Sequence, residues 1–269
     1  MSSTTEHTHH HVSVVDANKE FFNHGTDHGH ESFLEKLMKL KSVQEVYDVL
    51  TNQILKSYSF DVNKTRLLDF ACGDGMLHAS PWVSVHTKLT TSTFKGVMSL
   101  RLASHCKSIT GADISEGMTN AYNRKMHAND IHHAKAICGE LKADSLDGQK
   151  FDVIICLQAY HHIEDCLKIT QLLKSFLAPG GVLLVVDQLE GTHHMPAVLE
   201  DTLPIMQEMM KQSPHSHHMI AHAGGFSKEK MEEIYTGAEL TDFEFIEAFT
   251  KEREGKVFTL FLAKGVNPA

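Results

Sequence analysis

Short segments of continuous apolar residues alternate along the chain with segments of helical periodicity. The apolar segments lie at 66–70, 108–113, 134–138, 151–157 and 182–187. A continuous apolar run of this length is typical of a strand that is buried on both faces of a parallel sheet. Helical patterns at 116–128 and 165–176 follow two of these runs. The sequence therefore predicts βαβ units and an α/β fold.

The segments near the C-terminus predict how the sheet ends. Ser227 is placed to cap a helix that runs to about residue 236. Residues 243–249 and 257–263 are rich in Phe, Val and Leu and predict a final antiparallel pair of strands. We therefore expect a doubly wound, Rossmann-like, seven-stranded sheet with an antiparallel last strand, helices on both faces and a small helical cover.

Composition divides the chain into parts. Residues 1–20 are rich in Ser, Thr and His and predict a disordered tail. Residues 21–60 predict N-terminal helices, and residues 61–269 predict the main domain. Within that domain, residues 192–226 are rich in Met and His and contain several prolines. We expect this segment to cover the substrate at the carboxyl edge of the sheet.

Length and charge limit the classes of function. The chain has 269 residues, of which 42% are hydrophobic, which suffices for one large domain. A formal net charge of −9 argues against nucleic acid as a partner. No apolar run is long enough to span a membrane, and the N-terminus lacks the apolar stretch of a signal peptide. The five cysteines form no C-x-x-C pair, so we expect a reduced, cytoplasmic protein, with the nucleus as a further location.

The segment LLDFACGDG at 67–75 joins the first apolar run to a turn that contains two glycines. Gly73 and Gly75 have no Cβ atom and let a ligand approach the backbone closely. A dinucleotide site would need a third glycine where this chain has His78, and Asp74 would repel a pyrophosphate. S-adenosylmethionine (SAM) carries a sulfonium and an ammonium group and no phosphate. The turn therefore predicts a SAM site and disfavours an NAD-dependent oxidoreductase.

Two further predicted strands also end in acidic residues. Asp113 ends the strand at 108–113 and is suited to bind both ribose hydroxyls. Gly139 and Glu140 follow the strand at 134–138, where the adenine amino group would lie. Because the carboxyl ends of parallel strands meet at one edge of a sheet, we expect Asp69, Asp113 and Glu140 to line one cavity.

With these motifs the sequence resembles the class I SAM-dependent methyltransferases. It is similar to the methyltransferase type 11 and 12 groups, which include ubiquinone and menaquinone C-methyltransferases and many fungal small-molecule methyltransferases. The matching segments are LLDFACGDG (67–75), ITGADISEGM (109–118), AICGEL (136–141), FDVIICLQAYHHIED (151–165), LLKSFLAPGGVLLVVD (172–187) and AHAGGFSKEKMEEIYTGAELTDFEF (221–245). The resemblance covers the chain from about residue 60 to the end, and its motifs are specific for fold and cofactor rather than for substrate.

The resemblance implies roles for individual residues. Asp69, Gly73 and Gly75 would hold the methionine part of SAM. Asp113 would bind the ribose, with Ile114 against the adenine. The residues implied or placed at the cofactor by this reasoning are Asp69, Ala71, Gly73, Asp74, Gly75, Asp113, Ile114, Gly139, Glu140, Leu141 and Gln158.

One segment departs from the family pattern. Gly75 and Asp113 are further apart than the resemblance implies, because residues 77–100 interrupt the expected first helix without helical periodicity. One hypothesis is a surface insertion, which chains tolerate thermodynamically. The other is translated non-coding sequence, which the clean fit of the flanking segments favours slightly. Sequencing of the cDNA distinguishes the two, and the inserted residues would disturb the helix behind the SAM turn.

Histidines supply the candidate groups on the side of the methyl acceptor. His161 and His162 follow the strand at 151–157, and either is a candidate base for an acceptor that must lose a proton. The alternative is that one packs and the other caps the following helix. His222 precedes two glycines, Gly224 and Gly225, in a segment suited to a lid, and it is a third candidate.

The chain has 21 histidines, but the histidine clusters lack H-E-x-x-H or a paired carboxylate at ligand spacing. We therefore expect no functional metal site. The leading hypothesis is transfer of a methyl group from SAM to an oxygen, nitrogen or carbon atom of a small-molecule substrate, in secondary or quinone metabolism. The alternatives are a protein methyltransferase associated with nuclear regulators, for which a protein would be the partner, and a catalytically silent SAM-binding module.

Overall fold

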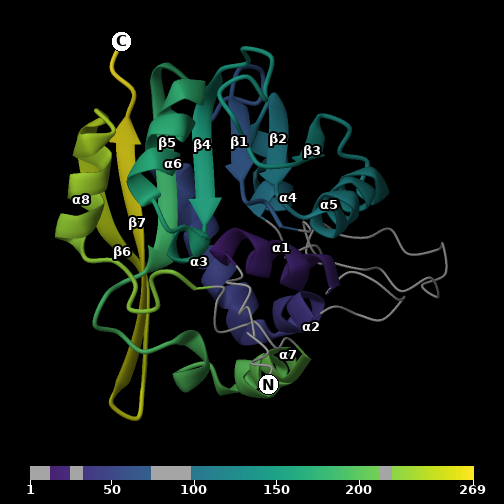
Figure 1. The fold of residues 1–269 in the computed structure, drawn as a ribbon, viewed down its shortest axis with the longest axis vertical. Helices are drawn as coiled ribbons and strands as arrows, with labels where there is room; N and C mark the ends of the chain where they lie inside the picture. The colour runs from purple at the N-terminus through teal and green to yellow at the C-terminus, as the bar shows by residue number, and fades with distance from the viewer. Residues whose placement is uncertain (1–12, 25–32, 74–97, 213–219) are drawn as a thin grey trace, which may run out of the picture.

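The structure is a computed structural model that describes residues 13–24, 33–73, 98–212 and 220–269. Its centre is one seven-stranded sheet in the order β3-β2-β1-β4-β5-β7-β6 (Figure 1). The strands are β1 (Arg66–Phe70), β2 (Ser108–Asp113), β3 (Ala134–Cys138), β4 (Phe151–Leu157), β5 (Leu177–Gln188), β6 (Thr241–Arg253) and β7 (Lys256–Val266).

The pairing of the strands confirms the predicted topology. The strands from β1 to β5 pair in parallel, with Asp69 opposite Gly111 on one side and Ile155 on the other. β7 runs antiparallel to both β5 and β6. The fold is therefore the expected Rossmann-like sheet, and the carboxyl ends of the parallel strands meet at one edge, which points downward in Figure 1.

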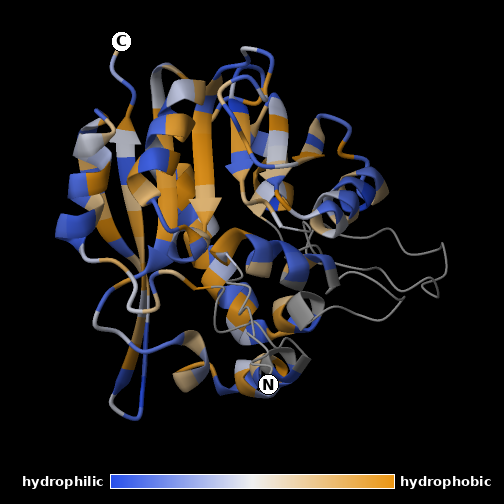
Figure 2. Cartoon of the chain, in the orientation of Figure 1, coloured by the Kyte–Doolittle hydropathy of each residue, from blue (hydrophilic) through white to orange (hydrophobic). Residues whose placement is uncertain are grey.

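Helices cover both faces of the sheet, as predicted. The α-helices are α1 (Val14–His24), α2 (Phe33–Lys39), α3 (Lys41–Ser57), α4 (Met98–Leu102), α5 (Glu116–Ala128), α6 (Cys166–Phe176), α7 (Leu203–Gln212) and α8 (Lys228–Gly237). Short 3-10 helices lie at Ala103–His105 (η1), Tyr160–His162 (η2), Met195–Ala197 (η3) and Glu200–Thr202 (η4). One core packs α3, α4 and α5 against the sheet, and a second core packs α6 and α8 against the opposite face. Figure 2 shows the result as hydrophobic central strands between helices with polar outer surfaces.

Side-chain caps fix where three of the helices begin. Ser227 accepts a hydrogen bond from the backbone N–H of Lys230, as the sequence predicts for the start of α8. Ser115 caps α5, and Asp165 caps α6, each through the backbone N–H three residues later. A polar side chain at this position satisfies a backbone donor that has no partner within the helix.

The N-terminal segment differs from the prediction of a disordered tail over residues 1–20. Residues 14–24 form α1, which packs against α5 and η2. Ala17 and Asn18 are buried in this contact region. Tertiary packing of this kind stabilises a short helix that its own sequence would not stabilise alone. The prediction for residues 1–12 lies outside the described residues.

The segment expected to form the cover, residues 192–226, has two different placements. Residues 221–226 contact His161 and the end of β5. α7 makes its main contacts with α2 and with η3 and η4. In Figure 1, α1 lies between α7 and the carboxyl edge of the strands. α1, which the sequence analysis assigned largely to the tail, contacts α5 and η2 at this edge, and α7 lies on the far side of α1 in this view.

The end of the segment set aside as an insertion belongs to the fold. Met98 and Ser99 in α4 are buried, and Met98 lies in the core cluster with Leu67 and Leu102. Residues 98–100 of the predicted insertion 77–100 are therefore part of a helix that packs in the core. Residues 77–97 lie outside the described residues, so both hypotheses for their origin stay open.

Candidate functional site

The turn after β1 is held against β2 by backbone contacts. The backbone N–H of Cys72 donates to the carbonyl oxygen of Ala112 over 3.1 Å. Ala71 and Gly73 both have left-handed φ angles, 56° and 60°. A Cβ atom on Gly73 would meet no described atom within 4 Å. The predicted partners Asp74 and Gly75 lie outside the described residues.

Asp113 holds the turn and the start of α5 together at the tip of β2. Its Oδ2 accepts from the backbone N–H of Gly73 over 3.0 Å, and its Oδ1 accepts from the backbone N–H of Ser115 over 2.9 Å. Both oxygens of this carboxylate are therefore engaged by backbone donors, one from the turn and one from the start of α5. The carboxylate is half-buried and has a fixed orientation, which is the property that ribose binding requires.

Asp69 lies beneath the turn rather than at the open tip of β1. Its carboxylate is 4% exposed, and its Oδ2 accepts from Ser99 Oγ over 2.5 Å. Burial raises the pKa of Asp69 to about 7, the Ser99 hydrogen bond opposes this rise, and the charge of Asp113 adds to it. Asp69 and Asp113 therefore interact electrostatically. The prediction that Asp69, Asp113 and Glu140 line one cavity is not met at Asp69, because this residue is buried and its carboxylate is bound to Ser99.

The tip of β3 forms the next part of the same edge. Gly139 has φ 136°, and its N–H donates to the carbonyl oxygen of Asp113 over 2.9 Å. No described atom lies within 4 Å of a Cβ built on Gly139. Glu140 is exposed, Leu141 is buried and Ile114 is half-buried. The structure therefore brings the predicted ribose and adenine residues together around the ends of β2 and β3.

Gln158 occupies the corresponding position after β4. It has a left-handed φ of 50°, and its backbone N–H donates to the carbonyl oxygen of Val186 over 2.7 Å. Its side chain is half-buried. Because β4 is paired with β1, Gln158 lies at the same edge as the turn after β1, and its contact with SAM stays a prediction.

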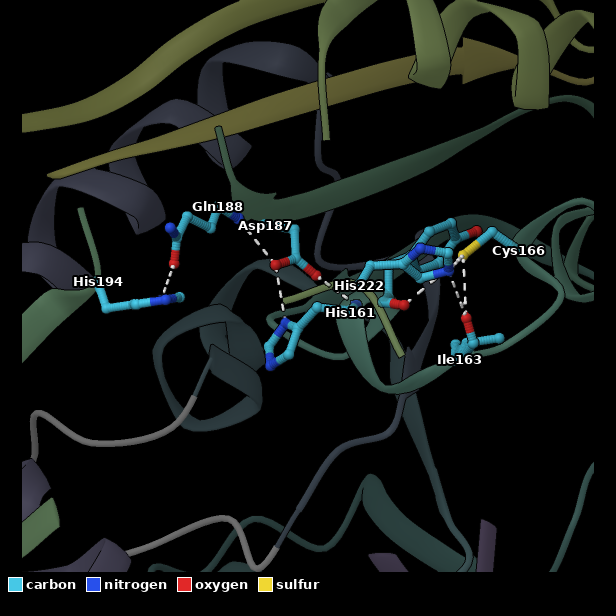
Figure 3. A network of polar contacts seen from close by, with 8 residues as sticks. His161, Ile163, Cys166, Asp187, Gln188, His194 and His222 are labelled. Atoms are coloured by element: carbon cyan, nitrogen blue, oxygen red, sulfur yellow. Dashed lines mark hydrogen bonds and ion pairs between the residues drawn. The ribbon is translucent and has the colours of Figure 1, made fainter. Parts of the chain in front are cut away.

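His161 is bound to a buried acid at the end of β5. Its Nδ1 lies 2.8 Å from Oδ1 of Asp187, and its backbone N–H donates to Oδ2 over 3.1 Å (Figure 3). Asp187 is 1% exposed, and 23% of the His161 side chain is exposed. One edge of the imidazole is therefore fixed by protein and the other is accessible.

His162 lies beside His161 and under α1. The two imidazole rings are 4.1 Å apart between centroids, and the ring of Phe22 meets His162 edge-on at 6.2 Å. α1 is fixed at a second point, because Oδ1 of Asn23 accepts from Ser115 Oγ over 2.7 Å. The N-terminal helix thus contacts both Ser115, next to Asp113, and His162.

His222 is held in place by contacts with Ile163, Phe226 and His161 and does not lie on a free lid. Its Nε2 lies 2.9 Å from the carbonyl oxygen of Ile163, and its ring packs against Phe226 with centroids 4.9 Å apart (Figure 3). The backbone N–H of His222 donates to the carbonyl oxygen of His161. At Gly225 a Cβ would come within 2.5 Å of the carbonyl oxygen of Gln188. Gly225 is therefore packed closely on the end of β5, whereas Gly224 is exposed.

Three residues of this edge were missed by the sequence analysis. Asp187 ends the run VLLVVD, and an acid at the end of an apolar strand is the same signal that identified Asp113. Ser99 was assigned to the insertion. Asn23 has no motif, and only its contact with Ser115 identifies it.

Other features of the described residues lie away from this edge. An open hollow of about 440 Å³ lies at the amino ends of the strands, lined in part by Arg66, Ser108 and Phe151. It is on the opposite edge from Asp113 and takes no part in the site. Within the described ranges, no group of three or more His, Cys, Asp or Glu side chains is arranged to hold a metal ion. None of the helices in those ranges combines the length and apolar character needed to cross a membrane.

Comparison with known proteins identifies the family. A family model described as a methyltransferase domain matches residues 34–242. The chain belongs to this family. The resemblance to class I SAM-dependent methyltransferases is thereby confirmed. The matched region extends from α2 to the start of β6 and includes the whole carboxyl edge of the parallel strands.

Individual relatives agree with this assignment. An uncharacterized methyltransferase of Schizosaccharomyces pombe is 30% identical over 187 residues, which are 67% of this methyltransferase and 55% of that protein. A ubiquinone biosynthesis O-methyltransferase of Coxiella burnetii is 29% identical over 89 residues, 33% of this chain and 37% of that protein. The alignments thus cover about half or less of the length of these two relatives.

A solved structure shows the same fold. The crystal structure of the N-methyltransferase NodS from Bradyrhizobium japonicum, in complex with S-adenosyl-L-homocysteine, has a TM-score of 0.57 and 15% identity. The match covers 94% of this methyltransferase and all of that chain. At this level of identity the likeness concerns the arrangement of strands and helices.

Proposed function

We propose that this methyltransferase binds SAM at the carboxyl edge of β1, β2 and β3 and transfers its methyl group to a small-molecule acceptor. The observation that carries the proposal is that both oxygens of the Asp113 carboxylate accept backbone hydrogen bonds. Two backbone N–H groups, from Gly73 and Ser115, fix its orientation at the tip of β2. A fixed acid at this strand end is the group that binds ribose hydroxyls in nucleoside-binding α/β proteins.

The residues at this edge fit SAM. No described atom lies within 4 Å of a Cβ built on Gly73 or Gly139, the glycines on either side of Asp113. Asp113 provides negative charge near a cationic ligand, whereas a pyrophosphate would be repelled. Ile114 and Leu141 offer apolar surface for an adenine ring, with Glu140 at its edge. When bound, SAM supplies an electrophilic methyl group, and the protein supplies proximity and orientation.

The acceptor would approach from the side of β4 and β5. Gln158, His161 and His162 lie there, next to the ends of the strands and under α1. The C. burnetii relative is described as acting in ubiquinone biosynthesis, which supports a small molecule as acceptor. The alternatives are a protein acceptor and a module that binds SAM without transferring its methyl group.

Two measurements test the proposal. Calorimetry with SAM, S-adenosylhomocysteine and NAD should give binding of the first two and none of NAD. Methyl-labelled SAM should then be incubated with cell extract and the label separated into small-molecule and protein fractions. Label in the small-molecule fraction supports the proposal. Label only in the protein fraction would show that the acceptor is a protein and not a small molecule. Binding of SAM without transfer of label would identify a catalytically silent module.

A further inference from the structure

Asp187 is a buried acid with a specific set of partners. It ends β5, is 1% exposed and accepts hydrogen bonds from two backbone N–H groups. These come from Gln188, over 2.7 Å to Oδ1, and from His161, over 3.1 Å to Oδ2. Oδ1 also lies 2.8 Å from Nδ1 of His161 (Figure 3). Burying a carboxylate is costly unless its oxygens are satisfied, and here each oxygen has at least one donor.

These contacts decide which nitrogen of His161 carries the proton. An ionised carboxylate only accepts hydrogen bonds, so Nδ1 of His161 is the donor to Asp187. In the neutral imidazole the lone pair is then on Nε2. Nε2 is on the opposite side of the ring from Asp187 and has no hydrogen-bond partner among the described residues. The neighbouring titratable group is His162, whose ring is 4.1 Å away.

We propose that Asp187 is a positioning residue that holds His161 with a free Nε2 lone pair, and that the acceptor is therefore a hydroxyl group. This inference rests on the proposed function. A neutral amine already offers a lone pair and needs no base before its nitrogen is methylated. A phenol-like hydroxyl has a pKa of about 10 and is weakly nucleophilic near neutral pH while it keeps its proton. A fixed imidazole base removes this limitation.

The balance of the step is simple. The acceptor oxygen forms a bond to the methyl carbon as the bond between that carbon and sulfur breaks. The hydroxyl proton moves to Nε2 of His161, and the products are a methyl ether, S-adenosylhomocysteine and a protonated imidazole. Asp187 stabilises the positive charge on that ring across the 2.8 Å contact. The imidazole later releases the proton to water.

The first test requires neither cofactor nor acceptor. Histidine tautomers are distinguished by 15N NMR of the imidazole nitrogens. We expect His161 to be protonated at Nδ1 in the native protein and to shift toward the Nε2–H form in Asp187→Asn. Glu190→Gln is the matched control, since Glu190 is exposed and three residues further along the chain. An Nε2–H form in the native protein overturns the proposal, and this result does not depend on whether the variant folds.

The second test uses catechol as a hydroxyl probe and aniline as an amine probe, each with methyl-labelled SAM. We expect label on catechol. Both His161→Gln and Asp187→Asn should then lower kcat about 100-fold, the low end for loss of a general base, with little change in KM. The inference is overturned if aniline alone is labelled, or if catechol stays unlabelled although SAM binds. It is also overturned if Asp187→Asn leaves kcat unchanged. Failure to bind SAM would contradict the proposed function instead, and the NMR result would still decide the role of Asp187.

Discussion

The backbone N–H of Gly73 donates to Oδ2 of Asp113 over 3.0 Å, and this bond fixes the turn after β1 to the tip of β2. The other oxygen of the same carboxylate holds Ser115 at the start of α5. One side chain therefore sets the relative positions of two strand ends and a helix. Its loss should affect the turn as well as any ligand that the carboxylate contacts.

Asp113→Asn should weaken SAM binding at least tenfold. The amide removes the charge and leaves one of the two backbone N–H groups facing an NH2 donor. Hydrogen bonds to charged groups contribute about 1.5–3 kcal/mol each, which corresponds to tenfold or more in affinity. Calorimetry with SAM measures the change. The matched control is Asp130→Asn, because Asp130 is exposed and lies in the turn after α5; equal affinities for both variants would contradict the role of Asp113.

Asp69 should make the stability of the fold depend on pH. Burial raises the pKa of Asp69 from its usual value of 3.8 to about 7, so the fold favours the protonated form. The resulting stabilisation is complete below about pH 4 and is lost as the pH rises through about 7. Asp69→Asn cannot ionise, so its free energy of unfolding should exceed that of the native protein more at pH 8 than at pH 5. The change in this difference should be on the order of 3 kcal/mol.

Urea unfolding at the two pH values measures this effect. Asp144→Asn, at an exposed site, removes the same charge and provides the comparison. If the curves of Asp69→Asn and the native protein stay parallel from pH 5 to pH 8, Asp69 is ionised throughout and the argument from burial is wrong.

Asn23→Ala should loosen α1 and reduce SAM affinity roughly fivefold. Oδ1 of Asn23 accepts from Ser115 Oγ over 2.7 Å and from the backbone N–H of Gly117 over 3.4 Å. A hydrogen bond of this kind contributes about 1 kcal/mol. Hydrogen exchange of residues 13–24 should become faster in the variant. Asn120→Ala, on the exposed side of α5, is the control; unchanged exchange in Asn23→Ala would show that other contacts hold the helix.

His222→Ala should lower the free energy of unfolding by about 1–2 kcal/mol and leave kcat within a few-fold of the native value. The physical reason is the loss of the contact between Nε2 and the carbonyl oxygen of Ile163, together with the packing on Phe226. Urea unfolding and a methyl-transfer assay give the two values. His132→Ala, at an exposed histidine, should change neither. A 100-fold fall in kcat at unchanged stability would restore His222 as a catalytic candidate.

The sheet could be predicted because each strand carries its own signal. The run FDVIICL is continuous and β-branched, and it forms β4 over the same residues. The N-terminal helix could not be predicted in this way. α1 follows a segment rich in Ser, Thr and His that indicates disorder, and its contacts are with α5 and η2, which are distant in the sequence.

The candidate site was predictable in its residue types and not in its pairings. Asp113 was identified from its position at the end of a strand, and its place at the ribose stays a prediction. The pairing of His161 with Asp187 joins residues from the ends of two strands, and only the fold brings them together. Ser99 was missed because its sequence neighbours lack helical periodicity, although its hydroxyl contacts Asp69.

Ala71 and Gln158 both have left-handed backbone angles, at the ends of the paired strands β1 and β4. A side chain in this conformation costs about 1–2 kcal/mol, and the rest of the fold must offset that cost. A laboratory screen for heat tolerance alone should therefore return glycine or asparagine at these two positions. A screen for turnover should keep the native residues, since the rigidity that they impose shapes the edge where the ligand would bind.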